Sequence, residues 1–197
     1  MTTTARIPAI EVTGPTGTLM KVVAKKMVGK VPDSLGVLWH YPAVFKDMMG
    51  INRKAEKWDQ LDENLAILAR MASAAAIGCN ACLDINYYMA HRQGLDEVKV
   101  REVPRWQDSD IYTPLERRVM AYAHAMCQTP VAVTDEQSAE LLEELGAPAL
   151  IELTARVGIM NVAARTNIAL GIHSEEYADA CGLPPLATST VAVGSVA

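Results

Sequence analysis

The sequence has few aromatic side chains and no excess of positive charge. It contains one Phe against ten Met, and half of its residues are hydrophobic. A core built from small and flexible side chains suits closely packed helices. The net charge of −5 gives no excess of Lys and Arg that could bind phosphates, so nucleic acid is not an expected partner.

The sequence also lacks a secretory leader and a charge-free apolar run of membrane-spanning length. Its first residues, MTTTARIPAIEVTGPTG, contain no apolar core of the kind that a signal peptide needs. The nearest candidate for a membrane span, residues 147–172, carries Glu152, Arg156 and Arg165. We therefore expect a cytoplasmic protein without a membrane segment. In that reducing compartment, a close pair of cysteines indicates redox or metal chemistry rather than a disulfide framework.

Helix signals run through the chain, and no stretch has the pattern of a βαβ unit. The sequence predicts one all-α domain over residues 18–183, between an irregular N-terminal arm (1–17) and an irregular C-terminal tail (184–197). Capping boxes at Thr113 and Thr134 start two of the helices. Helices are expected over residues 18–28, 35–40, 42–49, 62–77, 80–93, 96–101, 114–128, 135–145 and 147–172, and a loop over 103–113.

Cys79 and Cys82 form a C-x-x-C pair between two apolar, Ala-rich segments. Their spacing puts both sulfurs on one face of a helical turn, close enough to form a disulfide or to share a metal ion. A helix N-terminus also lowers the pKa of a thiol, because its unpaired N–H groups favour the thiolate. No other stretch brings reactive groups together so tightly.

Three interpretations of this pair remain open. A structural zinc site needs two further ligands, but Cys127 and Cys181 stand alone and the four histidines show no ligand spacing. The two cysteines could instead be small buried hydrophobic residues of an Ala-rich core. Their placement at a helix start favours a redox pair, and no metal or cofactor is expected. A thioredoxin fold is excluded because no strand precedes the motif.

At these residues the chain resembles the alkylhydroperoxidase D-like (AhpD-like), or carboxymuconolactone decarboxylase, family. The resemblance rests on the Ala-rich helix, the GC-x-x-C motif and the following helix that ends before LDEVKV. It extends to LWHYPAVFKDMM upstream and to NVAARTNIALGI near the end, and covers about residues 33–172. The resemblance implies an all-α fold with helices packed around the cysteine helix. It also implies a homo-oligomer, as a trimer or hexamer.

The peroxidase members of this family share the motif E-x11-C-x-x-C-x3-H. In them the second Cys reacts, the His activates it and the Glu relays protons. Here Cys79 and Cys82 match the motif, whereas Asn86 stands at the His position and Ile67 at the Glu position. Asn86 lies one turn from Cys82 and can donate a hydrogen bond to a thiolate. It cannot act as a general base.

Other polar residues are candidates for the missing relay. Glu63 lies one turn before Ile67 on the same helix face, although a solvated first-turn position is also expected for it. His40 is the best-placed candidate outside the two helices that flank the motif. Asp84 is expected to be exposed. A structural polar network is expected for Asn161, Arg165 and Asn167.

The resemblance and the dithiol together predict a thiol-dependent peroxidase or disulfide oxidoreductase. Cys82 would attack a peroxide or a partner disulfide, and Cys79 would resolve the intermediate to a Cys79–Cys82 disulfide. An unknown reductant would then restore the dithiol. Two alternatives stay open: a non-redox lyase of the carboxymuconolactone decarboxylase type, and a non-catalytic oligomeric binding module.

Overall fold

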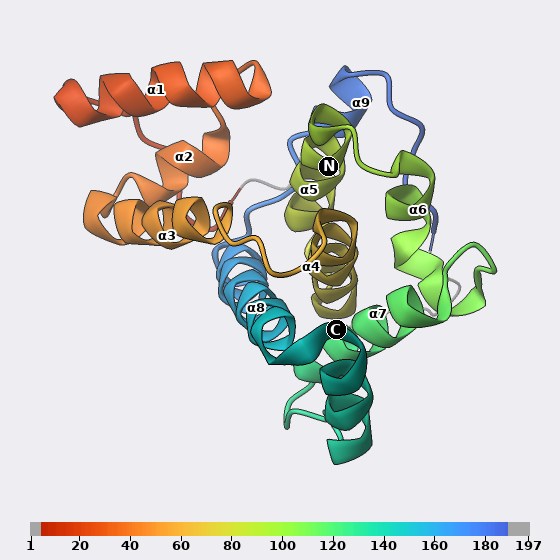
Figure 1. Cartoon of the computed structure of the whole chain (residues 1–197). Helices are drawn as coiled ribbons and strands as arrows, with labels where there is room; N and C mark the ends of the chain where they lie inside the picture. The colour runs from red at the N-terminus through yellow and green to blue at the C-terminus, as the bar shows by residue number, and fades with distance from the viewer. Residues whose placement is uncertain (1–4, 189–197) are drawn as a thin grey trace.

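The computed structural model describes residues 5–188 and confirms the predicted all-α fold (Figure 1). Over that range it contains nine α-helices, one 3-10 helix and no strand. The α-helices are α1 (Gly14–Val28), α2 (Asp33–Leu38), α3 (Pro42–Ala55), α4 (Glu63–Ile77), α5 (Asn80–Gln93), α6 (Glu97–Glu102), α7 (Pro114–Met126), α8 (Asp135–Leu170) and α9 (Tyr177–Ala180). The 3-10 helix, η1 (Val103–Asp108), lies where the sequence predicts a loop.

Helix α4 is the centre of the core. It packs against α5, α7 and α8, and side chains such as Ile67 and Met71 are completely buried. The Asp62 carboxylate accepts the backbone N–H groups of Asn64 and Leu65, which satisfies donors that the first turn leaves free. The helix ends at Gly78, whose φ of 81° requires a residue without a Cβ. Both ends agree with the prediction from the sequence.

Helix α8 forms a second layer beside α4 and is broken where the sequence predicts two helices. The break lies at Gly146, where φ is 77° and ψ is 163°. Length and composition alone would let α8 cross a bilayer. However, its second half packs against α4 and holds the ion pair between Glu152 and Arg156, 2.7 Å apart, inside the core. These contacts make the second half of α8 part of the core, and a cytoplasmic location remains a prediction.

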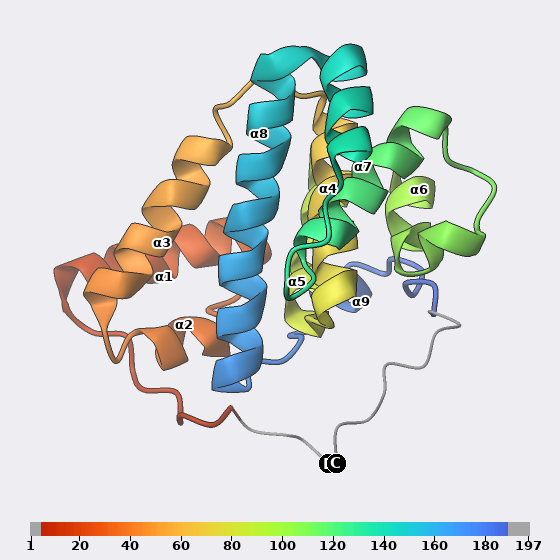
Figure 2. The same cartoon turned by 90° about the horizontal axis from the view of Figure 1, so that it is seen from below.

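Helices α1, α2 and α3 form a layer on the other side of α8 (Figure 2). Val12, Leu35 and Trp39 form a small core of their own in this layer. The predicted N-terminal arm was too long, because α1 begins at Gly14 rather than at residue 18. A Pro in the first helical turn, read there as a sign of irregular chain, starts the helix instead. Residues 1–4 and 189–197 of the predicted arm and tail lie outside the described residues.

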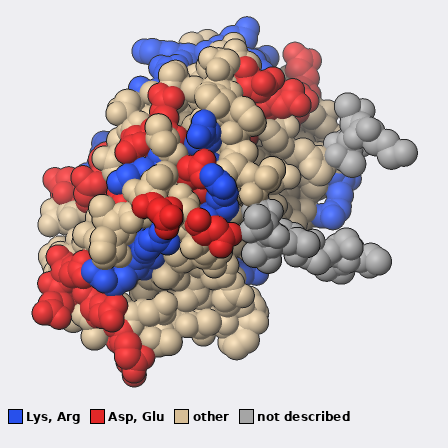
Figure 3. Space-filling model, turned by 90° about the vertical axis from the view of Figure 1, so that its right-hand side faces the viewer, with Lys and Arg blue, Asp and Glu red and all other residues tan. Residues whose placement is uncertain are grey.

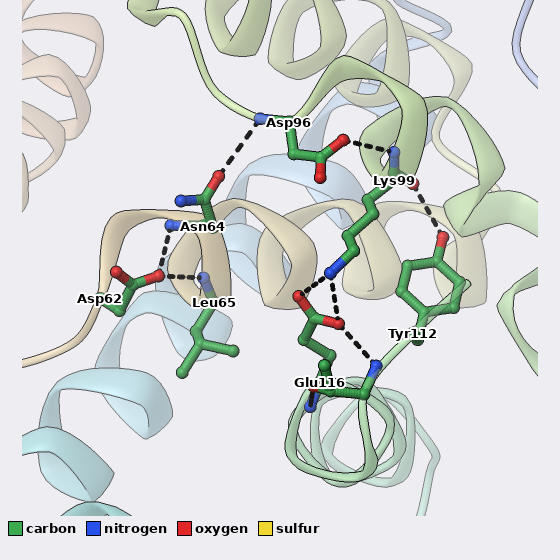
Figure 4. Close-up of polar contacts among 8 residues, drawn as sticks. Asp62, Asn64, Leu65, Asp96, Lys99, Tyr112 and Glu116 are labelled. Atoms are coloured by element: carbon green, nitrogen blue, oxygen red, sulfur yellow. Dashed lines mark hydrogen bonds and ion pairs between the residues drawn. The ribbon is translucent and has the colours of Figure 1, made fainter. Parts of the chain in front are cut away.

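A polar network joins α4 to α6 and α7 (Figure 4). The Glu116 carboxylate closes the capping box of α7 and also accepts Lys99 Nζ at 2.7 Å. Burial alone would raise the pKa of Glu116, but hydrogen bonds from Lys99 and Thr113 lower it below its ordinary value. Asp96 caps α6, and its backbone N–H reaches Asn64 on α4 at 3.2 Å. This network fixes the side of the molecule opposite α1–α3.

The surface on that side carries charges of both signs. Figure 3 shows Lys and Arg interspersed with Asp and Glu. Ion pairs such as Glu102–Arg105, with Oε2 and Nε 2.6 Å apart, and Lys99–Glu116 account for part of this pattern. Because the two signs are mixed, this face carries no strong field of one sign.

Candidate functional site

Cys79 and Cys82 meet at the start of α5. Cys79 is the N-cap residue and Cys82 lies in the first turn, with their Cα atoms 5.3 Å apart and their sulfurs joined in a disulfide. Both side chains are buried, with 1% and 3% of their surface exposed. Within residues 5–188 no group of three or more His, Cys, Asp or Glu side chains is arranged to hold a metal ion. The structure thus shows the pair as a buried disulfide at the start of a helix.

The turn between α4 and α5 positions the pair. After Gly78, the backbone N–H of Cys79 donates to the carbonyl oxygen of Ala74 at 2.9 Å, which completes the end of α4. The Sγ of Cys79 then accepts the backbone N–H of Cys82 at 3.2 Å. A sulfur that caps a helix in this way lies in the positive field of the unpaired N–H groups, which favours a thiolate once the disulfide is reduced.

Among the described residues, the Asn167 side chain on α8 makes a polar contact with the cysteine pair. Its Nδ2 lies 3.5 Å from the Sγ of Cys82. Asn86, at the position of the family histidine, donates instead to the carbonyl oxygen of Cys82 at 2.7 Å. The amide of Asn86 is thus engaged by the backbone of its own helix, and the donor to the sulfur comes from α8.

Asn161 on the same helix makes a matching contact with a different sulfur. Its Nδ2 lies 3.3 Å from the Sγ of the buried Cys127. Burial raises the pKa of the Cys127 thiol, and the hydrogen bond from Asn161 opposes that effect. Asn161 and Asn167 of α8 thus each contact a sulfur, and Arg165 donates to the carbonyl oxygen of Cys127 at 2.6 Å. The signal for both amide contacts was in the sequence, because an amide on an apolar helix needs a partner.

The two remaining relay candidates lie away from the disulfide. Glu63 is an exposed residue in the first turn of α4. His40 is also exposed, and its Nε2 lies 2.9 Å from the carbonyl oxygen of Pro8. The contacts of His40 hold the N-terminal segment, and the structure does not bring either side chain to the sulfurs. Ile67 is fully buried in the core.

The expectation that Asp84 is exposed was wrong. Asp84 follows Cys82 on α5 and is only 7% exposed. Its carboxylate accepts the Ser174 hydroxyl at 2.8 Å and the backbone N–H groups of Tyr177 and Ala178 at 3.0 and 2.9 Å. The short helix α9, which the sequence did not predict, covers this part of α5 (Figure 1). Asp84 therefore anchors the segment after α8 to the cysteine helix.

An apolar cavity of about 300 Å³ lies between the α1–α3 layer and the helices α5 and α8. Four methionines, Met20, Met27, Met48 and Met49, line it together with Leu35 and Phe45. Ala81 and Ile85 of α5 and Asn167 of α8 form the wall beside Cys82. Asn167 thus touches both the cavity and the Cys82 sulfur, although neither cysteine itself lines the cavity.

The segment that follows α8 closes one side of this cavity. It contributes His173, Glu175 and Tyr177 to the lining. The Glu175 carboxylate accepts the backbone N–H groups of Asp33 and Ser34 at the start of α2, at 3.2 and 3.1 Å. Burial, followed by the charge of Glu175, raises the pKa of Tyr177 far above its ordinary value, so its phenol stays neutral. The segment is thus held to α2 by Glu175 and to α5 by Asp84.

Comparison with known proteins places the chain among its relatives. The sequence profile of the carboxymuconolactone decarboxylase family matches residues 42–125. The uncharacterised protein YnjA of Escherichia coli K12 is 33% identical over 126 residues, which are 64% of this chain and 67% of that protein. The chain belongs to the carboxymuconolactone decarboxylase family. The resemblance seen in the sequence is confirmed.

Solved structures with the same fold include proteins of different activities. The debrominase Bmp8, as a cysteine-to-alanine variant in complex with 2,3,4-tribromopyrrole, is 22% identical with a TM-score of 0.77, over 91% of this chain and 96% of that one. An alkylhydroperoxidase AhpD core, an uncharacterised peroxidase-related protein from Ralstonia eutropha JMP134, is 18% identical with a TM-score of 0.73, over 90% of this chain and 96% of that one. These similarities establish the AhpD-like fold. The enzymes among the family and its neighbours support an enzymatic role in general.

Proposed function

We propose that this member of the carboxymuconolactone decarboxylase family is a thiol-dependent peroxidase that reduces apolar organic hydroperoxides. One observation carries the proposal: a cysteine pair at a helix N-terminus lies beside an apolar cavity, and Asn167 contacts both the cavity and the Cys82 sulfur. The first turn of α5 and the Asn167 amide both favour the Cys82 thiolate. Cys79 lies within bonding distance to resolve the product.

The reaction has two covalent steps. The Cys82 thiolate attacks the outer oxygen of the hydroperoxide, the O–O bond breaks, and Cys82 becomes a sulfenic acid while the alkoxide leaves and takes up a proton as an alcohol. The Cys79 thiol then attacks the Cys82 sulfur, which releases water and forms the disulfide. A dithiol reductant, supplied from outside, restores both thiols by disulfide exchange.

The walls of the cavity select the substrate. Methionine side chains are flexible and polarisable, so they adapt to hydrocarbon groups of different shape. Burying the organic part of a hydroperoxide here is favourable, whereas hydrogen peroxide has no apolar surface to bury. We expect cumene hydroperoxide to react faster than hydrogen peroxide.

A second candidate uses the same dithiol for reductive dehalogenation. The apolar cavity also suits a halogenated aromatic ring, and the fold is shared with a debrominase. Here the dithiol supplies two electrons, a proton from the medium completes a new C–H bond, halide leaves and the disulfide forms. The test measures bromide release from 2,3,4-tribromopyrrole by the reduced protein. Bromide release that is faster than oxidation of the dithiol by cumene hydroperoxide would favour dehalogenation.

The experiment counts thiols in reduced protein before and after one equivalent of cumene hydroperoxide. We expect the wild type to lose two thiols, with the two protons missing from the peptide that carries Cys79 and Cys82. Cys82→Ser should not react, and Cys79→Ser should stop at a sulfenic acid that a dimedone probe captures. Cys181→Ser, which removes the exposed free thiol, is the control and should still lose two.

An unchanged thiol count in the wild type would contradict the proposal. The lyase and the binding module that the sequence leaves open both predict that result, because neither consumes the dithiol.

A further inference from the structure

One histidine of the chain lines the cavity beside the dithiol. All four histidines lie within residues 5–188. Three are engaged elsewhere: His40 with the carbonyl oxygen of Pro8, His91 with Glu97 and His124 with Gln128. The fourth, His173, lines the cavity, and its imidazole makes no hydrogen bond with any described residue.

His173 and Asn167 belong to two walls of the same cavity. Asn167 lies in the last turns of α8, and His173 follows the left-handed residue Gly171 that ends this helix. Neither cysteine lines the cavity, so Asn167, whose Nδ2 contacts the Cys82 sulfur at 3.5 Å, links that sulfur to the space that His173 lines.

Building on the peroxidase function proposed above, we propose that His173 is the general acid of the reaction and protonates the leaving alkoxide oxygen. The family positions for a proton relay hold Asn86 and Ile67, and neither side chain can supply a proton to an alkoxide. Histidine can, because a ring nitrogen of the imidazolium gives up its proton and later takes one back.

In the proposed step, His173 supplies the one proton that the leaving oxygen needs. As the O–O bond breaks, its electron pair stays on the leaving oxygen, and the imidazolium of His173 gives that oxygen its proton. The products are the sulfenic acid on Cys82, the alcohol and a neutral imidazole. His173 is exposed on its other side, so water outside the cavity returns the proton before the next turnover.

The titratable groups around His173 come from α2, the connection before it, the segment of His173 itself and α9. Asp33 of α2 shares a second, larger hollow with His173, and so do Glu175 and Glu176 of its own segment. Tyr177 lines the dithiol cavity. Lys30 lies beyond Glu175, with its Nζ 3.6 Å from Oε2 of that carboxylate. Glu175 also fixes the segment to α2, so the imidazole is held at the rim of the cavity.

The test uses oxidants whose leaving groups differ in basicity. Cumene hydroperoxide leaves as an alkoxide that needs a proton, whereas 3-chloroperoxybenzoic acid leaves as a carboxylate that does not. Single-turnover oxidation of reduced His173→Gln is compared with the wild type for both oxidants. Gln keeps a polar side chain of similar reach but cannot transfer the proton. His91→Gln, which alters an exposed histidine on α5 outside the cavity, is the matched control.

We expect His173→Gln to slow oxidation by cumene hydroperoxide about 100-fold or more and oxidation by the peracid less than about threefold. Alkylation of Cys82 by iodoacetamide, which involves no alkoxide, should be unchanged. Equal slowing with both oxidants, or no slowing with either, would overturn the role of His173 while leaving the dithiol peroxidase intact. A wild type whose dithiol neither oxidant oxidises would overturn the peroxidase function itself.

Discussion

Asn167 Nδ2 on α8 lies 3.5 Å from Cys82 Sγ on α5, although the two residues are 85 positions apart in the chain. This contact places a hydrogen-bond donor at the sulfur that the family pattern marks as reactive. A donor to a thiolate stabilises the charged form of the sulfur more than its neutral form. The pairing of α5 with α8 therefore builds the core and also brings a donor to the sulfur of the proposed reaction.

Replacing Asn167 tests this contact. Asn167→Ala should raise the pKa of the Cys82 thiol and slow its alkylation near neutral pH about tenfold, since a hydrogen bond to a charged group contributes roughly 1.5–3 kcal/mol. The rate of iodoacetamide alkylation against pH measures the effect. Asn161→Ala, which removes the equivalent donor to Cys127, is the control. Equal alkylation rates for both variants and the wild type would show that Asn167 does not support the thiolate.

Asp84 should be a major determinant of stability in the segment that closes the cavity. Asp84→Ala removes the carboxylate that accepts three hydrogen bonds. We expect the free energy of unfolding to fall by about 2 kcal/mol, since losing a helix cap costs about that much. Urea unfolding measures the loss of stability of the whole protein, and faster hydrogen exchange of the backbone amides of residues 174–178 shows that the loss lies in this segment. Asp179→Ala, at an exposed position of α9, should leave both nearly unchanged. Unaltered exchange in residues 174–178 of Asp84→Ala would contradict the anchoring role.

The sequence predicts the parts of this site whose signals lie next to one another in the chain, and it misses the parts that depend on a residue of another helix. The bounds of α5 are marked locally by Cys79 and Gly94, and the prediction of 80–93 agrees with the structure. The break at Gly146 is equally local. Helix α9 is four residues long and has no side-chain cap of its own, because its N–H groups are satisfied by Asp84 on another helix. No local pattern reveals such a partner.

Dependence on another helix also explains why the sequence pointed to the wrong donor for the Cys82 sulfur. Helical spacing pointed to Asn86 as the donor to Cys82, since the two residues lie one turn apart on α5. In the structure this spacing places the Asn86 amide against the backbone carbonyl of Cys82 instead. Asn167 and His173 approach the site from the end of α8, and only the tertiary packing of α8 against α5 brings them there.

The ion pair at Glu116 should make stability depend on pH in the acid range. The pKa of the Glu116 carboxyl is lowered in the folded protein. The carboxylate therefore contributes fully to the free energy of unfolding above the pKa that it has in the unfolded chain, and this contribution is lost as the pH falls through its lower pKa in the folded protein. Glu116→Gln should cost about 1–3 kcal/mol at neutral pH and progressively less below about pH 4. Urea unfolding of both proteins between pH 3 and 7 measures the difference. A penalty that stays constant across this range would contradict the role of the carboxylate charge.

The second half of α8 leaves apolar side chains exposed on a single chain. Ile151 is 69% exposed and Val162 is 58% exposed. We propose that these side chains are covered by further copies of the chain, in a trimer or hexamer, because contiguous exposed apolar surface is uncommon on monomers. Light scattering should give a multiple of 21.3 kDa at micromolar concentration.

A variant pair tests where the copies meet. Val162→Glu should lower the mass toward that of one chain, whereas Val131→Glu, at an exposed residue of the connection before α8, should not. A wild type with the mass of one chain would contradict the assembly, and an unchanged mass for Val162→Glu would exclude this face.

The most direct test of the dithiol peroxidase is the stoichiometry of a single turnover. Reduced protein is mixed with less than one equivalent of cumene hydroperoxide, the alcohol is measured by chromatography, and the Cys79–Cys82 disulfide is measured by mass spectrometry. The account predicts one cumyl alcohol for each disulfide formed, with Cys127 and Cys181 still reduced. Alcohol formed without the disulfide, or hydroperoxide left unconsumed while both thiols stay free, would contradict it.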